Sequence, residues 1–321
     1  MNKFFLILLN SISLILLQAE PPSDSPYTYI DFEHVSLSND TLRDRNNNRE
    51  FIIRKEGVSG YSKDHVFGES KFWISSTMSS NGKNGFGVLL PNVVNYDSNN
   101  IGESSKNRIE LEISSIDNDS SYLKLEETRY YSFKIYIHPQ SHDIAKETIF
   151  FQAWQNHDSS NKQGRQPPFS LSFIKWRSEE TGTGYKWQVS TARCKDKDYG
   201  DKNNKTNCKV KDIIAKPIFT STTGLEKGVW YKFVVKFKPS TNKKGAVKVW
   251  LNDEPIVAQS HERNFGYNKS LDKNTSIILD QFEVRVGAYR GRLKDENIGK
   301  TILIFDEIKI GNSYDQVNDE D

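Results

Sequence analysis

The stretch that decides the fold begins Gly228-Val-Trp-Tyr-Lys-Phe-Val-Val-Lys-Phe237. Its lysine-bearing positions alternate with aromatic and aliphatic ones, and a period of two predicts a β-strand with two different faces. Residues 239–245 have the composition of a turn. Ala246-Val-Lys-Val-Trp-Leu251 is a second alternating run, and it ends at the polar segment Asn252–Pro255. Two such runs joined by a short loop that contains glycine predict an antiparallel hairpin.

Two more strands are expected downstream, at Phe282–Arg290 and Thr301–Ile310. The valines and the alanine of the first strand share one face, which predicts packing against the core. The other face carries a carboxylate, a guanidinium, a glycine and a phenol, at Glu283, Arg285, Gly287 and Tyr289. A glycine inside a strand often marks the close approach of a ligand or of another backbone. This face is therefore expected to form the floor of a groove.

These segments resemble a known family. The Gly-x-Trp strand, Val-Trp-Leu-Asn-Asp, Arg-Val-Gly-Ala-Tyr-Arg and the final Phe-Asp-Glu-Ile-Lys-Ile-Gly are similar to the C-terminal half of the heparin-lyase-like polysaccharide lyases. The related jelly-roll alginate and glucuronan lyases have a similar Gly-x-Tyr strand. The resemblance covers roughly residues 29–311. It implies an all-β fold, a concanavalin-like jelly-roll β-sandwich that forms a single domain over residues 28–313.

The rest of the chain agrees with this fold class. A chain of 321 residues can bury one large core, and no linker composition divides it. Many short strands with turn signals between them are typical of a sandwich or jelly roll. Loops are expected at 39–50, 95–106 and 156–168, and strands at 29–34, 51–54, 71–75, 108–113, 130–137, 147–155, 169–176 and 185–190.

The N-terminus has the pattern of a secretory signal peptide. Met1-Asn-Lys precedes an apolar run with two polar interruptions, and Ala19 offers a small residue for cleavage. The run is short for a membrane span. Residues 1–19 are therefore expected to be removed and 20–27 to be loose, which gives an extracellular protein with no membrane attachment. The acidic tail 314–321 is expected to be disordered.

Secretion would also determine whether the two cysteines form a disulfide and whether the Asn-x-Ser/Thr triplets are glycosylated. Cys194 and Cys208 lie in one polar segment, and an oxidising compartment predicts a disulfide between them. A metal site is the weaker alternative, because no histidine lies near them in the sequence. Five Asn-x-Ser/Thr triplets are glycosylation candidates in a eukaryotic host, at Asn39, Asn118, Asn204, Asn268 and Asn274. The 44 basic and 42 acidic residues balance, which gives no electrostatic reason for nucleic-acid binding.

Polar faces of three expected strands could carry chemistry. They hold Arg108 with Glu110, Gln152 with Trp154, and Arg285 with Tyr289. An acidic polysaccharide has a carboxylate on each uronic acid. Its β-elimination has three requirements: first, the carboxylate is neutralised; second, a base removes the C5 proton; third, an acid protonates the departing glycosidic oxygen. Arg108 and Gln152 suit the first task, because a guanidinium forks onto a carboxylate. Tyr289 suits the last, and also the second where nearby cations favour its phenolate.

The resemblance supports the same positions. The family carries Arg-x-Glu, Gln-x-His and Lys/Arg-x-Gly-x-Tyr strands in this order, and this chain has Arg108-Ile-Glu110, Gln152-Ala-Trp154 and Arg285-Val-Gly-Ala-Tyr289. The departure is Trp154, which stands where the family has a histidine that acts as base or carboxylate neutraliser. His157, three residues on, could take that function. Otherwise Tyr289 would act as both base and acid, which suits a syn elimination.

We therefore expect a secreted lyase that acts on a uronate-containing polysaccharide. Its catalytic residues are expected to be Tyr289, Arg108, Gln152 and His157, with Glu110, Trp154, Arg285 and Arg290 in contact with the polymer. A secreted, lectin-like jelly roll that binds acidic polysaccharide without cleaving it is the alternative. A glycoside hydrolase is a weaker reading, because no strand carries its paired carboxylates. A monomer without a cofactor is expected, and no metal-ligand spacing is present, although the resemblance admits a structural Ca²⁺.

Overall fold

The computed structural model describes residues 28–319, apart from 57–65, 94–106, 114–122, 156–165, 195–212, 272–277, 291–297 and breaks of up to four residues. Several predictions fall outside the described residues: the signal peptide 1–19, the segment 20–27, His157, Cys208 and the five Asn-x-Ser/Thr asparagines. Among the helices that are described, none is long and apolar enough to cross a membrane.

One sheet of the described chain, the β11 sheet, has eight strands. In spatial order they are β18 (Glu254–Phe265), β17 (Ser240–Leu251), β16 (Trp230–Lys238), β11 (Arg129–Ile137), β22 (Thr301–Gly311), β7 (Gly85–Leu90) and β6 (Lys71–Ser75), with β1 (Thr28–Ile30) beside β22. The expected hairpin is confirmed, since β16 and β17 pair antiparallel.

The second sheet of the described chain, the β21 sheet, has ten strands. In order they are β15 (Ile213–Thr220), β14 (Trp187–Cys194), β13 (Phe169–Phe173), β12 (Thr148–Gln155), β21 (Gln281–Arg290), β9 (Asn107–Glu112), β4 (Arg49–Glu56), β3 (Thr41–Asp44) and β2 (Val35–Ser38), with β10 (Leu123–Lys124) beside β21. Two small pairs complete the described strands: β5 (Val66–Phe67) with β8 (Asn92–Val93), and β19 (Ser270–Leu271) with β20 (Ile278–Leu279).

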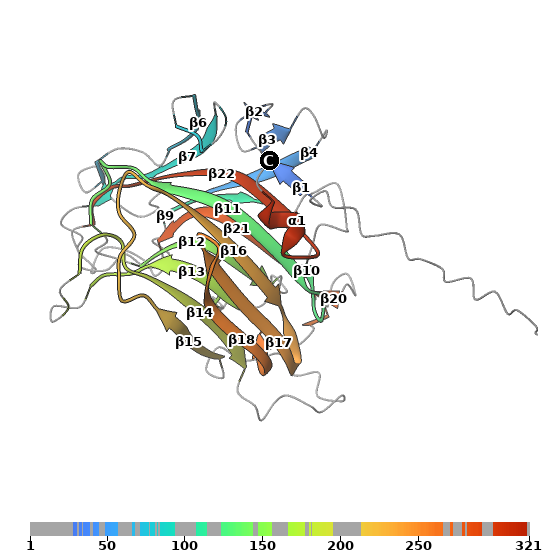
Figure 1. The fold of residues 1–321 in the computed structure, drawn as a ribbon. Helices are drawn as coiled ribbons and strands as arrows, with labels where there is room; N and C mark the ends of the chain where they lie inside the picture. Colours follow the sequence, from blue (N-terminus) through green and yellow to red (C-terminus); the bar gives the residue numbers. More distant parts are fainter. Residues whose placement is uncertain are drawn as a thin grey trace, which may run out of the picture.

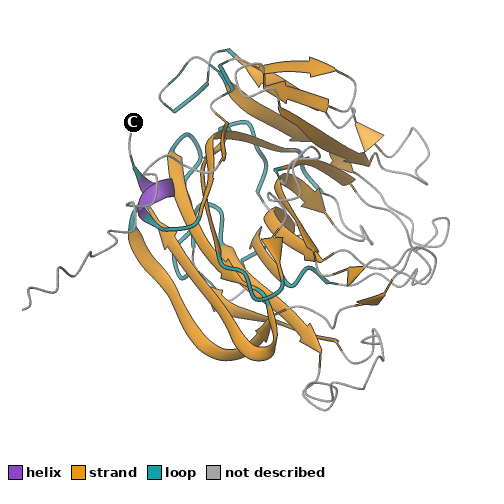
Figure 2. Cartoon of the chain, turned by 90° about the vertical axis from the view of Figure 1, so that its right-hand side faces the viewer, coloured by secondary structure: helices purple, strands orange, loops and turns teal. Residues whose placement is uncertain are grey.

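The two sheets form the two layers of a sandwich, as Figures 1 and 2 show. Between them lies a core of phenylalanine, isoleucine, leucine and valine side chains. Phe133 of β11 stacks on Phe151 of β12 with ring centroids 5.2 Å apart, and on Phe233 of β16 at 5.7 Å. Each fully buried aromatic side chain contributes about 2–3 kcal/mol of transfer free energy. The two-layer, all-β sandwich expected from alternation is confirmed.

Strands far apart in the sequence lie side by side at the centre of both layers. In one sheet β21 lies between β12 and β9, and in the other β22 lies between β11 and β7. All of these pairs are antiparallel. The late strands therefore complete sheets that the early strands begin, which is the interleaving of a jelly roll. This interleaving brings the polar positions of β9, β12 and β21 onto one surface.

Two expected irregular segments are strands instead. Residues 240–245, expected as a turn, belong to β17, where Ser240 lies opposite Phe265 and Gly245 opposite Arg263. The hydrogen bonds come from β18, a partner that local composition does not reveal. A two-residue turn, the positive-φ pair Asn252 (48°) and Asp253 (67°), joins β17 to β18, as in two-residue hairpin loops.

Polar composition was also misleading near both ends of the described chain. Within the expected loop 39–50, Thr41–Asp44 forms β3, which pairs with β4 on one side and with the edge strand β2 on the other. The tail expected to be disordered contains the short helix α1 (Asp315–Asn318), with Val317 fully buried. Burial of a valine contributes about 1.5 kcal/mol or more. Lys232 and Lys309 of the sheet also donate hydrogen bonds to the backbone oxygens of Asn318 and Asp319, so these contacts together fix the segment against the sheet.

Candidate functional site

Three adjacent strands of the β21 sheet bring most of the predicted site residues together. In register, Gln152 on β12 lies opposite Arg285 on β21, and Tyr289 on β21 lies opposite Arg108 on β9. The intervening apolar residues of each strand pack in the core. Because side chains alternate along a strand, the polar ones share the opposite face. We call Arg108, Glu110, Gln152, Arg285 and Tyr289 the central polar face.

Glu110 is the electrostatic centre of this face, and it is only 1% exposed. Gln152 Nε2 donates a hydrogen bond to Glu110 Oε1 over 2.5 Å. Arg108 Nε lies 3.3 Å from Glu110 Oε2, and Arg285 Nη1 lies 3.8 Å from the same oxygen. A buried carboxylate is tolerated only when cations and donors surround it. Glu110 therefore orients both groups that were expected to neutralise the substrate carboxylate, the guanidinium of Arg108 and the amide of Gln152.

The phenol of Tyr289 lies next to the more exposed of these cations. The guanidinium carbon of Arg108 is 4.6 Å from the centroid of the Tyr289 ring, a cation–π contact. The Arg108 side chain retains 12% exposure, whereas Gln152 is 1% exposed. Arg108 and Tyr289 are therefore the members of the set best placed to meet a substrate, while Gln152 acts chiefly on Glu110.

Gly287 explains how β21 and β9 come close enough for this arrangement. Its φ is +146°, a backbone conformation that side chains with a Cβ rarely adopt. A Cβ added there would lie 2.2 Å from the backbone oxygen of Ile109. The sequence analysis expected that Gly287 marks the close approach of either a ligand or another backbone. The structure shows the second, because the backbone of β9 lies against it.

Trp154 and Arg285 lie further along the same face. Trp154 is half-buried on β12 and lies opposite Glu283 of β21. Glu283 forms an ion pair with Arg285, which also faces Glu110. The guanidinium of Arg285, which was expected to contact the polymer, is thus already paired with two carboxylates of the protein. An indole at this point offers a flat apolar surface on which a sugar ring can stack.

Arg290 does not belong to the central polar face. It is 1% exposed and projects to the side opposite Tyr289, where it donates hydrogen bonds to the backbone oxygens of Pro91 (3.2 Å) and Gly299 (2.8 Å) and to the Thr301 hydroxyl. Burial lowers the pKa of its guanidinium to about 10. The expectation that Arg290 contacts the polymer is therefore corrected: the side chain ties together three chain segments.

We expect Arg290→Met to lower stability without changing substrate binding. Removing the guanidinium leaves buried carbonyl oxygens unpaired, at a cost of about 3 kcal/mol, or roughly 6–12 °C in Tm for a domain of this size. Thermal unfolding followed by circular dichroism measures the first effect, and KM on a cleaved polymer measures the second. The half-buried Arg193, changed to methionine, is the matched control. An unchanged Tm with a raised KM would contradict the structural role.

Two predicted features of the site stay untested by the geometry. His157 lies outside the described residues, so its proposed part as a base remains a prediction. Within the described residues no group of three or more histidine, cysteine, aspartate or glutamate side chains could hold a metal ion.

The sequence analysis assigned no function to two neighbours of the central polar face. Glu112 is 1% exposed and lies opposite Arg285, so the strict alternation Arg-x-Glu-x-Glu was the signal that could have found it. Ser170 of β13 is buried and lies opposite Gln152. Nothing in the sequence pairs these two, because the β12–β13 register depends on a bulge in β12.

Comparison with solved structures finds polysaccharide lyases among the matches. An endo-β-1,4-glucuronan lyase from the fungus Trichoderma reesei is 12% identical, with a TM-score of 0.53 over 83% of this chain and 97% of that chain. An alginate lyase in complex with an alginate trisaccharide is 10% identical, with a TM-score of 0.43 over 81% and 98%. An alginate lyase from Klebsiella pneumoniae is 12% identical, with a TM-score of 0.42 over 72% and 82%.

At these identities the structural likeness shows the fold alone, and the glucuronan lyase confirms the jelly roll. A search of curated protein sequences finds no match to the chain. The sequence model of one family, Polysaccharide lyase, matches residues 58–309, a span that includes every residue of the central polar face. The chain therefore belongs to the polysaccharide lyase family.

Proposed function

We propose that this protein is a secreted lyase that cleaves a uronate-containing polysaccharide by β-elimination. The observation that carries the proposal is that Arg108 and Gln152 both contact one buried carboxylate, Glu110, while the ring of Tyr289 lies against the Arg108 guanidinium. Family membership supplies the reaction class. The similarity to a glucuronan lyase and to an alginate lyase bound to its oligosaccharide makes acidic polymers the first substrates to test.

Arg108 is the group that neutralises the substrate carboxylate in this proposal. The Nε atom of its guanidinium lies 3.3 Å from Glu110 Oε2, and a guanidinium is the side-chain group whose geometry matches a carboxylate with two parallel N–H groups. Neutralising the carboxylate stabilises the carbanion that forms when the C5 proton leaves. Gln152 and Glu110 act as positioning residues, because they fix the guanidinium beside the Tyr289 ring.

Tyr289 carries both proton transfers. Its phenolate removes the C5 proton, and the electron pair of that C–H bond forms the C4–C5 double bond as the bond from C4 to the glycosidic oxygen breaks. The same phenol then returns the proton to the departing oxygen, which leaves as a neutral hydroxyl group, and the phenolate is regenerated. One residue can do both tasks only when proton and leaving group lie on the same side of the sugar, which predicts a syn elimination. His157 is the alternative base.

The test is to incubate the protein with glucuronan, alginate, heparin and pectate and to follow the ultraviolet absorbance of the unsaturated product. Rising absorbance with one polymer supports the lyase. The absence of product from all four, with retained binding to one of them, would favour the lectin-like alternative. Trp154 is the reason for this alternative, because it replaces the histidine of the family motif.

We expect Arg108→Ala to lower kcat/KM by about 10²- to 10³-fold, the usual effect of removing one charge-stabilising group. The exposed Arg43 on β3 of the same sheet is the matched control, and its replacement by alanine should leave kcat/KM unchanged. Thermal unfolding of both variants separates lost catalysis from lost folding. Equal activity of Arg108→Ala and Arg43→Ala would remove Arg108 from the mechanism.

The secretion part of the proposal depends on residues 1–19 alone. We expect the protein collected from the medium of a secretory host to begin near Glu20, as N-terminal sequencing or intact mass would show. A product that stays in the cell with Met1 in place would contradict secretion and would leave the chemistry of the central polar face unaffected.

A further inference from the structure

The outward face of the β11 sheet carries two pairs of lysines in direct cross-strand register. Lys134 on β11 lies opposite Lys232 on β16, and Lys236 on β16 lies opposite Lys248 on β17. All four alternate with core residues, so they project away from the sandwich interior. Like charges placed directly opposite one another destabilise a sheet. Two such pairs on three neighbouring strands therefore suggest that the face serves an anionic ligand.

The two pairs differ in how much of their charge is already compensated. Lys134 Nζ forms an ion pair with Glu307 at 2.8 Å, and Lys232 Nζ lies 3.6 Å from Asp253. Among the described residues, Lys236 and Lys248 have no acidic partner. Their ammonium groups lie over the rings of Tyr130 (5.5 Å) and Trp250 (5.4 Å). Two positive charges on this face are thus left for a ligand.

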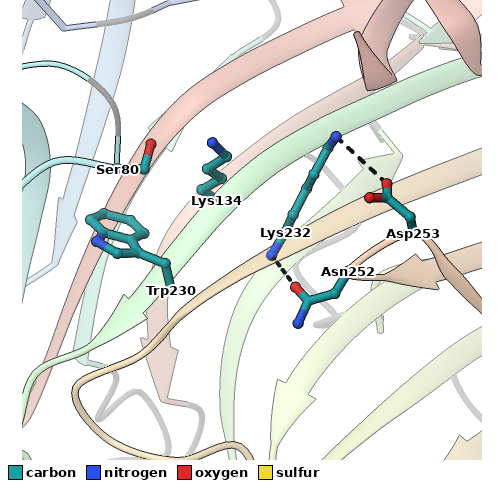
Figure 3. A pocket seen from close by; sticks show the side chains of 6 residues that line it. All are labelled: Ser80, Lys134, Trp230, Lys232, Asn252 and Asp253. Atoms are coloured by element: carbon teal, nitrogen blue, oxygen red, sulfur yellow. Dashed lines mark hydrogen bonds and ion pairs between the residues drawn. The ribbon is translucent and has the colours of Figure 1, made fainter. Parts of the chain in front are cut away.

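A pocket of about 320 Å³ opens at one end of the lysine pairs. Figure 3 shows Trp230 on one side, Lys134 beside it, and Lys232 with Asn252 and Asp253 on the other side. The half-exposed indole of Trp230 is held by the ring of Tyr136, 5.3 Å away. Lys232 is fixed by the backbone oxygen of Asn318, which accepts its hydrogen bond over 2.8 Å.

The chemistry of this pocket matches a charged sugar. A flat aromatic ring offers an apolar surface to the C–H face of a pyranose, and the surrounding amide and ammonium groups are donors for hydroxyl and carboxylate oxygens. The uncompensated Lys236 and Lys248 continue the positive surface along β16 and β17. Neutral sugars would leave those two charges without a partner, so an acidic chain fits the whole surface better.

We propose that this surface, the outer lysine surface (Lys134, Trp230, Lys232, Lys236 and Lys248), is a second, non-catalytic binding site for acidic polysaccharide. One uronate occupies the pocket against Trp230, and the chain continues over Lys236 and Lys248. The choice of polymer rests on the function proposed above. The site lies on the opposite face of the sandwich from Tyr289, so a long chain held here raises the local concentration of its other segments at the central polar face.

The test uses Lys236→Gln/Lys248→Gln and, separately, Trp230→Ala, each in a Tyr289→Phe background so that polymer survives. Affinity electrophoresis in gels that contain alginate or polyglucuronate gives Kd. We expect each variant to raise Kd about tenfold, the effect of losing one of two linked contacts, with a weaker salt dependence in the lysine variant. Lys175→Gln/Lys216→Gln, two exposed lysines elsewhere, removes the same charge and should leave Kd unchanged. Dextran in the gel should not retard the protein.

Separate readouts distinguish failure of this site from failure of the proposed activity. If wild-type protein cleaves none of the polymers but the variants still lose binding, the outer lysine surface stands without the lyase. If variants with Tyr289 intact cleave long polymer with unchanged KM and bind with unchanged Kd, the outer lysine surface is refuted and the lyase stands. A raised KM on long polymer with unchanged kcat/KM on short oligosaccharides supports the second site, because a short chain cannot reach both faces.

Discussion

Replacement of Tyr289 by phenylalanine is expected to abolish polymer cleavage while the protein stays folded. The change removes only the phenolic oxygen, which the proposed mechanism uses for both proton transfers. General acid–base catalysis by one positioned group is worth about 10²- to 10⁴-fold, and one residue acting twice places the loss at the upper end. Initial rates from product absorbance, with the variant and the wild type at matched concentration, measure it.

The ring that remains explains why folding should be unaffected. Phenylalanine retains the aromatic face against which the Arg108 guanidinium lies at 4.6 Å, and the side chain is only half-buried. Tyr29→Phe, at a half-buried tyrosine of the other sheet with Lys309 over its ring, is the matched control and should keep full activity. Unchanged turnover in Tyr289→Phe would refute the assigned role, whereas its loss together with a lower Tm would point to misfolding.

The second large effect is expected on stability, from Gly287→Ala. The added Cβ would lie 2.2 Å from the backbone oxygen and 3.1 Å from the carbonyl carbon of Ile109, and backbone atoms cannot rotate away as a flexible side chain can. The φ of +146° adds strain of its own. We expect a loss of about 3 kcal/mol or more, which lowers Tm by roughly 6–12 °C.

Gly228→Ala separates the clash from the strain. Gly228 also has a positive φ, +82°, but the nearest atom to a Cβ there is Pro139 Cγ at 3.7 Å, an ordinary contact. Its replacement should therefore cost only about 1 kcal/mol. Calorimetric unfolding of both variants measures the difference. Equal losses would show that the β9 and β21 backbones can move apart, in which case the close packing of these strands would not depend on glycine.

Alternation alone predicted which side chains of each strand share a face, because the side-chain period of a strand is two. It placed Arg108 and Glu110 on one side of their strand and Arg285, Gly287 and Tyr289 on one side of theirs. The same rule places Arg290 opposite Tyr289, so its assignment to the polymer went against the parity of its own strand. Its buried partners Gly299 and Thr301 come from a later segment.

Composition failed where the partner strand, and not the local sequence, supplies the hydrogen bonds. Residues 240–245 are rich in polar side chains and glycine, yet they pair with β18. Thr41–Asp44 is polar and forms a strand near a sheet edge. Propensity describes what a segment would do alone, and strand pairing overrides it whenever a neighbour satisfies the backbone.

The sequence by itself determined the strands, their two faces and the residue types able to assist an elimination, because these depend on local periodicity and side-chain chemistry. Only the tertiary structure decided that β12, β21 and β9 are neighbours and that Glu110 contacts Arg108, Gln152 and Arg285. It also decided that Lys236 and Lys248 lie opposite each other in the other sheet. Strand order and register arise from pairing between segments far apart in the chain, and no local pattern encodes which partners meet.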